Sequence, residues 1–343
     1  MQTGISRKRF VTGAAAAAGL AALVPALSPG RARAARPIVL KFGVDLASDH
    51  PTTVGAIAAG KQIESATNGR VKLQVFPNSQ LGNDTNMLSE LRSGAMQMMG
   101  IGDNILAALV PAAAIDNIGF AFKDSQTAWD ALDGAVGDPV RADITKVGLH
   151  PMHRIWDEGF RQVTSSTKQI KTPQDLSGFK IRVPPSPISV DLFRALGAAP
   201  VTLNIAELYT ALQTHVVDGQ ENPLGNIYTQ KFYQVQKYCS LTNHMWVGYW
   251  ILMNGTVWNG LEPADQKIVE DAFNAQALVQ RKANEELDAS LEGKLKAEGM
   301  EFFQPDLAAF RAALAKSNFY TSWKAKFGPA LWAALEKVTG PLG

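Results

Sequence analysis

Strand-like and helix-like segments alternate at the start of the chain, and this alternation restricts the fold more than any other feature. We expect strands over residues 38–44, 71–75 and 96–101, where apolar and β-branched residues are continuous or alternate with polar ones. Helices are expected between them over Val54–Ala66 and Asp84–Ser93, which end before Asn68-Gly69 and Gly94. This order is typical of βαβ units, so the sequence predicts an α/β fold with a parallel sheet.

The second half of the chain shows the same kinds of segment. Strands are predicted over Phe179–Val183 and over the aromatic segment His244–Asn254. Helices are predicted over Ser189–Leu196 and Ala206–Thr214. Between the two halves, Ser165–Asp175 is polar and contains a proline, and we expect the chain to cross between two lobes there.

One predicted helix is longer than a small domain. Glu262–Glu298 contains few helix breakers, and at 1.5 Å per residue it would reach about 55 Å. The chain has 343 residues, a length that favours two domains. We therefore expect this helix to brace both lobes.

The first 34 residues have the pattern of an export signal. They contain five cations and no acid, an alanine-rich apolar run from Gly13 to Leu27, and then Ala32-Arg33-Ala34, which suits a signal peptidase. A membrane anchor is the weaker interpretation, because a span needs about 20 apolar residues. Ser6–Phe10 is similar to a twin-arginine signal with Lys8 in place of the second arginine, so the general secretion route also stays open.

The charge balance changes when residues 1–34 are set aside. The remaining 28 basic residues face 31 acidic ones, a formal charge of −3. No basic stripe supports nucleic-acid binding, so no nucleic-acid partner is predicted. The expected location of the mature protein is the periplasm, across the inner membrane.

Motifs of the common enzyme classes are missing from the sequence. There is no phosphate-binding G-x-x-x-x-G-K-[ST] loop, no G-x-S-x-G elbow and no H-E-x-x-H helix. The single cysteine, Cys239, excludes an intrachain disulfide framework and a Cys-cluster zinc site. His150 and His153, followed by Asp157 and Glu158, are interpreted as a polar connection and not as metal ligands. We predict no catalytic residue, no metal and no cofactor, and an exported enzyme remains an alternative.

A segment around Arg182 carries the main functional signal. Arg182 lies at the carboxyl end of a predicted strand, the end that faces the ligand crevice in open α/β sheets. Its planar guanidinium can bind a carboxylate through two hydrogen bonds. A structural ion pair is the alternative role for this arginine.

Several segments together resemble the solute-binding receptors of tripartite ATP-independent periplasmic (TRAP) transporters, in the C4-dicarboxylate-receptor-like family. The resemblance extends over nearly the whole chain after residue 34. It depends on His50-Pro51, Thr67–Arg70, Pro77–Gly82, Gly178–Pro184, Ala211–Gln213, Asp218–Pro223 and Thr242–His244, together with the long helix. Gly119 departs from the family pattern, which usually has proline there, and His215 stands at a position often held by a small turn residue.

The resemblance implies a two-lobed, flytrap-like periplasmic-binding-protein fold with the long helix spanning both lobes. Lobe I would contain residues 37–160 and 248–287, and lobe II residues 161–247 and 288–343. It implies a monomeric receptor that closes on a small organic acid and delivers it to the subunits of a TRAP membrane permease. Arg182 would form the main salt bridge to the ligand carboxylate, Asn222 would donate a second hydrogen bond, and Arg161 would be a further arginine of the pocket.

Four more residues are candidates for the site. Asp45 and Asp103 follow predicted strands and could accept hydrogen bonds from ligand hydroxyl or amino groups, or they could be solvated loop acids. Trp156 and Trp246 belong to an unusual supply of aromatic residues. Core packing is the commoner role of such residues, and a pocket position would favour an aromatic or bulky acid.

The class of ligand and of importer is left open at this level. The acid could be a dicarboxylate, a sugar acid or an aromatic acid. A receptor for another importer class, such as an ATP-driven one, is the alternative among binding proteins, and the motifs around Arg182 and Asp218–Pro223 argue against it.

Overall fold

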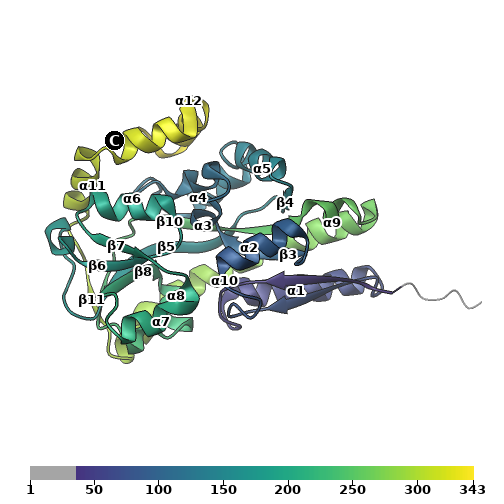
Figure 1. The fold of residues 1–343 in the computed structure, drawn as a ribbon, viewed down its shortest axis with the longest axis horizontal. Coiled ribbons are helices and arrows are strands. Elements are labelled where there is room, and N and C mark those ends of the chain that lie inside the picture. The colour runs from purple at the N-terminus through teal and green to yellow at the C-terminus, as the bar shows by residue number, and fades with distance from the viewer. Residues whose placement is uncertain (1–35) are drawn as a thin grey trace, which may run out of the picture. The chain divides into compact units, whose positions relative to one another are not determined.

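Five segments at the start of the described chain form the predicted β-α-β-α-β unit (Figure 1). The computed structural model describes residues 36–343, so the predicted signal peptide lies outside the described residues. Strand β1 (Ile38–Gly43) pairs in parallel with β2 (Val71–Phe76) and β3 (Met98–Gly102). The helices α1 (Pro51–Ala66) and α2 (Asp84–Ser93) connect these strands. The α/β prediction for this part is therefore confirmed.

Helix α1 begins three residues before its predicted start. Pro51 occupies the first turn, where a missing N–H costs nothing, and Nδ1 of His50 accepts a hydrogen bond from the Thr52 N–H at 3.2 Å. Histidine is not among the usual capping residues, which is why the sequence pattern placed the start at Val54.

The sheet continues through strands that come much later in the chain. Its order is β2-β1-β3-β10-β5-β8-β6-β7. Strand β10 (Trp246–Asn254) lies antiparallel between β3 and β5 (Trp156–Ser165). Beyond β5 come β8 (Gly219–Pro223), β6 (Lys180–Val183) and β7 (Ala199–Thr202). The sheet is mixed and not purely parallel, because β10 and β5 run against their neighbours.

Strand β5 joins two groups of strands. Its first half, up to Phe160, pairs with β10, and its second half, from Arg161, pairs with β8. Gly159, with φ 107°, lies between the halves, a backbone conformation that favours glycine. One group contains β1, β2, β3, β4 (Leu149–Pro151) and β10. The other contains β6, β7, β8, β9 (Tyr238–Ser240) and β11 (Glu301–Phe303), which gives the expected two-lobed fold. The predicted crossing segment Ser165–Asp175 begins only after β5 has already joined the two groups, so that prediction was placed too late.

The long helix α10 (Pro263–Ala297) spans both groups, as predicted. It packs on α1 on one side, on β5 in its middle and on α8 (Leu224–Thr229) and β11 (Glu301–Phe303) on the other. Figure 1 shows it between the part around α1 and the part around α7 (Ile205–Gln213) and α8. Its 35 residues correspond to about 52 Å.

The remaining elements cover the sheet and its edges. They are β4 (Leu149–Pro151), β9 (Tyr238–Ser240), α3 (Asp103–Leu106), α4 (Ser125–Asp133), α5 (Gly137–Lys146), α6 (Pro187–Ala195), α7 (Ile205–Gln213), α9 (Gly255–Asn259), α11 (Leu307–Lys316) and α12 (Phe319–Thr339), with the 3₁₀ helices η1 (Pro111–Asn117), η2 (Pro173–Leu176) and η3 (Phe232–Gln234).

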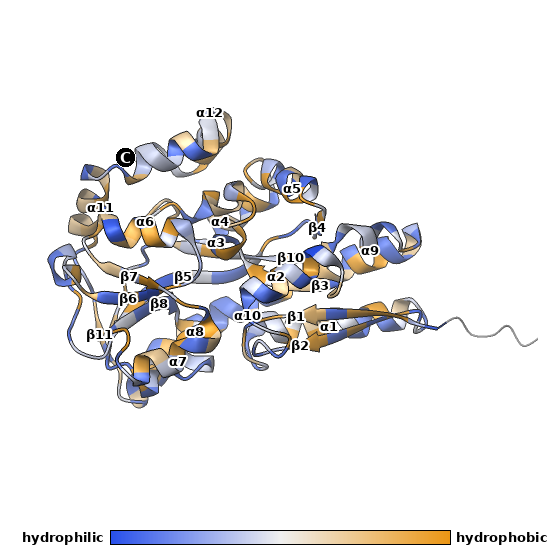
Figure 2. Cartoon of the chain, in the orientation of Figure 1, coloured by the Kyte–Doolittle hydropathy of each residue, from blue (hydrophilic) through white to orange (hydrophobic). Residues whose placement is uncertain are grey.

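Buried apolar residues of the strands form much of the hydrophobic core. Apolar colours mark β1, β2 and α6 in Figure 2. All nine residues of β10 are buried, because this strand is covered on both faces. Residues 36–343 contain no helix that combines the length and the apolar character needed to cross a membrane.

Candidate ligand-binding site

A cavity lies where the ends of several strands meet between the two groups of strands. Residues from β5, β6, β8 and β10 and from the segments after β1 and β3 line it. They are Asp45, Gly102, Asn104, Ile105, Glu158, Arg161, Arg182, Pro184, Ile205, Asn222 and Tyr249. The structure therefore brings together four of the seven candidates: Arg182, Arg161, Asn222 and Asp45.

Arg182 is the cation of this wall whose two Nη groups are both without a protein acceptor within residues 36–343. It is the third residue of β6 and is only 1% exposed. Its Nε donates to the carbonyl oxygen of Leu203 at 2.8 Å, while neither Nη atom has a protein acceptor in the described chain. Burial lowers the pKa of Arg182 to about 10, and the Glu221 charge opposes this effect, so the side chain remains a cation at neutral pH. A buried guanidinium with two unused donor groups is suited to an anion.

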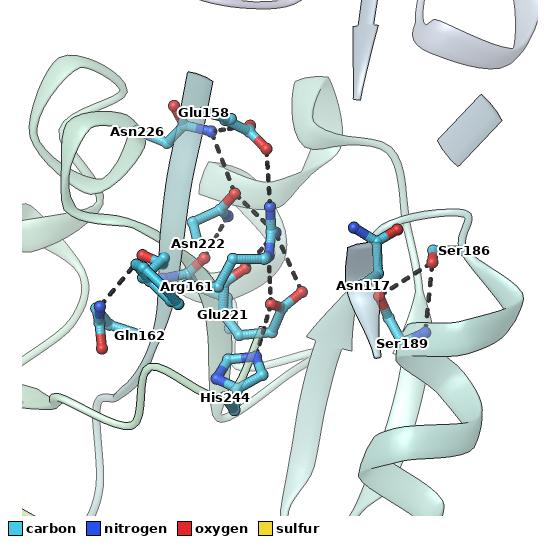
Figure 3. A network of polar contacts seen from close by, with 12 residues as sticks. Asn117, Glu158, Arg161, Gln162, Ser186, Ser189, Glu221, Asn222, Asn226 and His244 are labelled. Atoms are coloured by element: carbon cyan, nitrogen blue, oxygen red, sulfur yellow. Dashed lines mark hydrogen bonds and ion pairs between the residues drawn. The ribbon is translucent and has the colours of Figure 1, made fainter. Parts of the chain in front are cut away.

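Arg161 uses its donors differently, on protein partners (Figure 3). Its Nε donates to Oε2 of Glu221 at 2.5 Å, and Nη2 donates to Oε1 of the same residue at 3.1 Å. Nη2 also donates to Oδ1 of Asn222 at 3.0 Å, and Nη1 to Oε2 of Glu158 at 3.2 Å. The charge of Arg161 is thus largely neutralised inside the protein, and this arginine holds β8 and Glu158 in place.

His244 completes the surroundings of Glu221. Its Nε2 lies 3.1 Å from Oε2 of Glu221, and its Nδ1 lies 2.8 Å from Oγ1 of Thr242. Burial lowers the pKa of His244, so we assign a neutral ring that donates from Nε2 and accepts at Nδ1. Burial opposes the charge of Glu221, but Arg161 and His244 outweigh it and hold the pKa of this carboxyl below its usual value.

Asn222 is fixed by a chain of amides and hydroxyls. Its Nδ2 donates to Oε1 of Gln220 at 2.5 Å, and Nε2 of Gln220 donates to Oγ1 of Thr164 at 2.9 Å. Nδ2 of Asn226 lies 3.3 Å from Oδ1 of Asn222. Asn222 therefore has a set orientation at the cavity, with one hydrogen of its amide group left over.

Two carboxyl groups face the cavity beside the arginines. The hydroxyl of Tyr249 donates to Oδ1 of Asp45, and Nδ2 of Asn226 donates to Oε1 of Glu158 at 2.7 Å. Burial raises the pKa of Asp45, although Tyr249 opposes the rise. Burial also raises the pKa of Glu158 to about 7, against the effect of Arg161.

Three residues of the cavity, Glu158, Asn104 and Tyr249, were not predicted as site residues. The available signal was the position of Glu158, three residues before Arg161.

The family model for bacterial extracellular solute-binding proteins, family 7 (DctP), matches residues 42–321. The chain belongs to this family. The predicted resemblance to TRAP solute receptors is thereby confirmed.

Several known proteins are similar to this family-7 protein, and two of them are named with a ligand. The 2,3-diketo-L-gulonate-binding periplasmic protein YiaO of Escherichia coli is 34% identical over 276 residues, which cover 80% of this chain and 84% of that one. A TRAP periplasmic solute-binding protein from Polaromonas, solved with bound D-erythronate, is 31% identical with a TM-score of 0.84, covering 88% of this chain and 98% of that one. The uncharacterized protein y4mM of Sinorhizobium fredii is 36% identical over 291 residues, which cover 85% of this chain but only 53% of its own length.

Three predicted site residues of this family-7 protein lie outside the cavity wall. Trp156 packs in the core against Phe273, with ring centroids 6.2 Å apart. Trp246 packs in a second core cluster, edge-on to Phe122 at 6.2 Å. Both indoles are turned into the layers beside the sheet because β5 and β10 are covered there, so the core-packing alternative describes them.

Asp103 is the third predicted site residue outside the cavity wall, and it binds the backbone of β10. Its Oδ2 accepts from the Gly248 N–H at 2.6 Å, beside the bulge at Val247/Gly248, and its Oδ1 accepts from Nδ2 of Asn117 at 2.8 Å. Burial, with Asp116 next to it, raises the pKa of Asp103 well above its usual value. Within residues 36–343 no group of three or more His, Cys, Asp or Glu side chains is arranged to hold a metal ion.

Proposed function

We propose that this family-7 protein is the periplasmic solute receptor of a TRAP transporter, and that it binds a small organic acid and delivers it to a membrane permease. The observation that carries the proposal is the buried Arg182, whose two Nη groups have no protein acceptor in the described chain and which lines the cavity. A carboxylate taken from water needs a charge partner with good hydrogen-bond geometry, and this guanidinium can supply one.

The other residues of the cavity have supporting roles in this proposal. Asn222 donates its remaining amide hydrogen to the same carboxylate, since Gln220 and Arg161 fix its orientation. Arg161 lines the cavity and acts mainly by holding Glu221, Asn222 and Glu158, because its own donors are used on those partners. The names of YiaO and of the Polaromonas protein, with a diketogulonate and an erythronate, support an organic acid as ligand.

The lobes in this proposal have the boundaries predicted from the sequence. Residues 37–160 with 248–287 form lobe I, and residues 161–247 with 288–343 form lobe II. The change of partner strand on β5, from β10 at Phe160 to β8 at Arg161, supports the first boundary. The receptor acts as a monomer, binds no nucleic acid and catalyses no reaction.

Calorimetry on the protein from residue 35 to residue 343 tests the proposal. The protein is first unfolded and refolded to remove any bound acid, and far-UV circular dichroism verifies refolding. The panel contains C4-dicarboxylates, sugar acids, keto acids and aromatic acids. We expect one class to bind, and a ligand at 100 times its Kd to add about 2.7 kcal/mol of apparent stability. Refolded protein that binds no acid of any class would overturn the proposed function, and turnover of a bound acid would favour an enzyme.

A further inference from the structure

The charges around the cavity are out of balance. Arg161 is occupied by Glu221, so Arg182 is the cation of the wall that remains for a ligand. Two carboxyl groups also line the wall, those of Asp45 and Glu158, and Glu158 forms an ion pair with Arg161 at 3.2 Å. The wall therefore has one unused cation and more acid than it can neutralise.

A third buried carboxyl group interacts electrostatically with Asp45 and Arg182. Asp84, the first residue of α2, is 1% exposed, and neither of its carboxyl oxygens has a hydrogen-bond partner in the described chain. Burial raises the pKa of Asp84 well above its usual value, the nearby Asp45 raises it further, and Arg182 opposes the rise. Asp84 is therefore electrostatically coupled to Asp45 and Arg182, and its raised pKa favours the neutral, protonated carboxyl.

The free hydrogen-bonding groups of the wall fall into two kinds. Donors are the Nη groups of Arg182, the remaining Nδ2 hydrogen of Asn222, and Nδ2 of Asn104, which is buried without a partner within residues 36–343. Acceptors are the carboxyl groups of Asp45 and Glu158, each of which has room beyond its present bonds. A carboxylate placed on Arg182 satisfies the donors, and the acceptors then require O–H or N–H groups from the rest of the ligand.

A second carboxylate on the ligand would meet the acceptors instead. When Asp45 and Glu158 are ionised, these like charges in a site of low dielectric repel the second carboxylate strongly, and no donor is left for it. A hydroxyl group at the same place would donate to Asp45 or Glu158 without adding charge.

Resting on the proposed function, we propose that the cavity selects a monocarboxylate whose other polar groups are hydrogen-bond donors, and that Asp45 and Glu158 are the residues that reject a second carboxylate. Hydroxyl groups and an ammonium group are the two sources of such donors. Arg182 determines that an acid binds, whereas Asp45 and Glu158 determine which acid binds.

Pairs of ligands that differ in one terminal group test this inference. An aldonate and the aldarate of the same configuration differ only in a terminal CH₂OH or carboxylate, and pairs with four and six carbons cover two lengths. Hydroxy-amino acids of matching length distinguish the ammonium source. Calorimetry at pH 8 measures each Kd. We expect the better monocarboxylate to bind at least 100-fold more tightly than its dicarboxylate partner.

Variants then assign the selectivity to residues. Glu158→Gln and the double variant Asp45→Asn/Glu158→Gln keep the side-chain shapes, and we expect them to reduce the ratio of the two Kd values at least tenfold. Asp288→Asn removes a carboxyl on α10 that does not line the cavity, so it should leave the ratio unchanged. Thermal unfolding of each variant verifies its fold.

The outcomes separate the inference from the proposed function. If acids bind but the dicarboxylate partner binds as tightly as the monocarboxylate, or an aromatic acid without donors binds best, the inference fails and the receptor proposal stands. If the variants fold and keep the wild-type ratio, Asp45 and Glu158 are not the selecting residues and the assignment is overturned. If no acid binds, the proposed receptor function is overturned, and the inference that rests on it is overturned with it.

Discussion

Arg161 and Glu221 form a two-point ion pair across β5 and β8, with Nε 2.5 Å from Oε2 and Nη2 3.1 Å from Oε1. Both side chains are at most 3% exposed. Loss of Glu221 would remove the closer of two carboxylate partners of the buried Arg161 and leave it with Glu158 at 3.2 Å. We expect Glu221→Gln to lower the free energy of unfolding by about 3–5 kcal/mol, as measured by urea denaturation. Asp271→Asn, which breaks the exposed pair with Lys267, should change it by less than about 1 kcal/mol. Equal losses in the two variants would contradict this prediction.

Arg182 should behave in the opposite way, because neither of its Nη groups has a protein acceptor in the described chain. Arg182→Met keeps most of the aliphatic volume and removes a buried cation. We expect ligand binding to weaken more than 100-fold while the free energy of unfolding without ligand stays the same or rises. Arg182→Lys should weaken binding at least tenfold, since lysine lacks the planar two-donor geometry. Calorimetry and urea denaturation check the two effects, and an unchanged Kd in either variant would refute the role of Arg182.

Asp288 makes stability depend on pH. Burial, and then Asp157, raise the pKa of Asp288 to about 7, whereas an unfolded chain has about 3.9. The folded state therefore holds the proton more tightly, so the contribution of this group is complete below about pH 4 and is lost as the pH rises through 7.

Asp288→Asn imitates the protonated form at every pH. The stability of this variant relative to the wild-type protein should increase by about 2 kcal/mol between pH 5 and pH 8. Urea denaturation at several pH values measures the change. Asp271→Asn, on the exposed side of the same helix, should follow the wild-type profile, and a flat difference for Asp288→Asn would show that the carboxyl does not titrate in this range.

Gly159 is predicted to be sensitive to substitution. Its φ of 107° is strained for any L side chain, and an added Cβ would lie 3.4 Å from Oδ2 of Asp288. We expect Gly159→Ala to destabilise the protein by about 1–3 kcal/mol. Gly293 in α10 has open space around it, so Gly293→Ala should stabilise by about 0.5–1 kcal/mol. Thermal unfolding measures whether the stability falls in Gly159→Ala and rises in Gly293→Ala. If both variants are destabilised, the prediction is wrong.

The sequence predicted the elements whose pattern is local. The strand-helix order from Ile38 to Gly102, the exact bounds of α2 and the near-exact bounds of α10 were all accessible, because periodicity and end signals lie within each segment. Arg182 was placed at a strand end by the same reasoning.

Strand β5 was missed for a physical reason. Asp157, Glu158, Gly159 and Arg161 are unusual in a buried strand, and here they are tolerated because residues far along the chain compensate them. Asn284 on α10 donates to Asp157, Asn226 donates to Glu158, and Glu221 accepts from Arg161. Such compensation depends on tertiary contacts between residues about 60 to 130 positions apart, which no local pattern contains.

The place of β10 in the sheet has a consequence for biosynthesis. A nascent chain that has not reached Trp246 lacks the strand that lies between β3 and β5, so neither strand has its native neighbour on that side. The sheet can close only after Asn254 has left the ribosome, and α10 can dock only after Ala297 has followed. For most of translation the polypeptide is therefore without its native tertiary structure, a state in which a chaperone could hold it for export before folding.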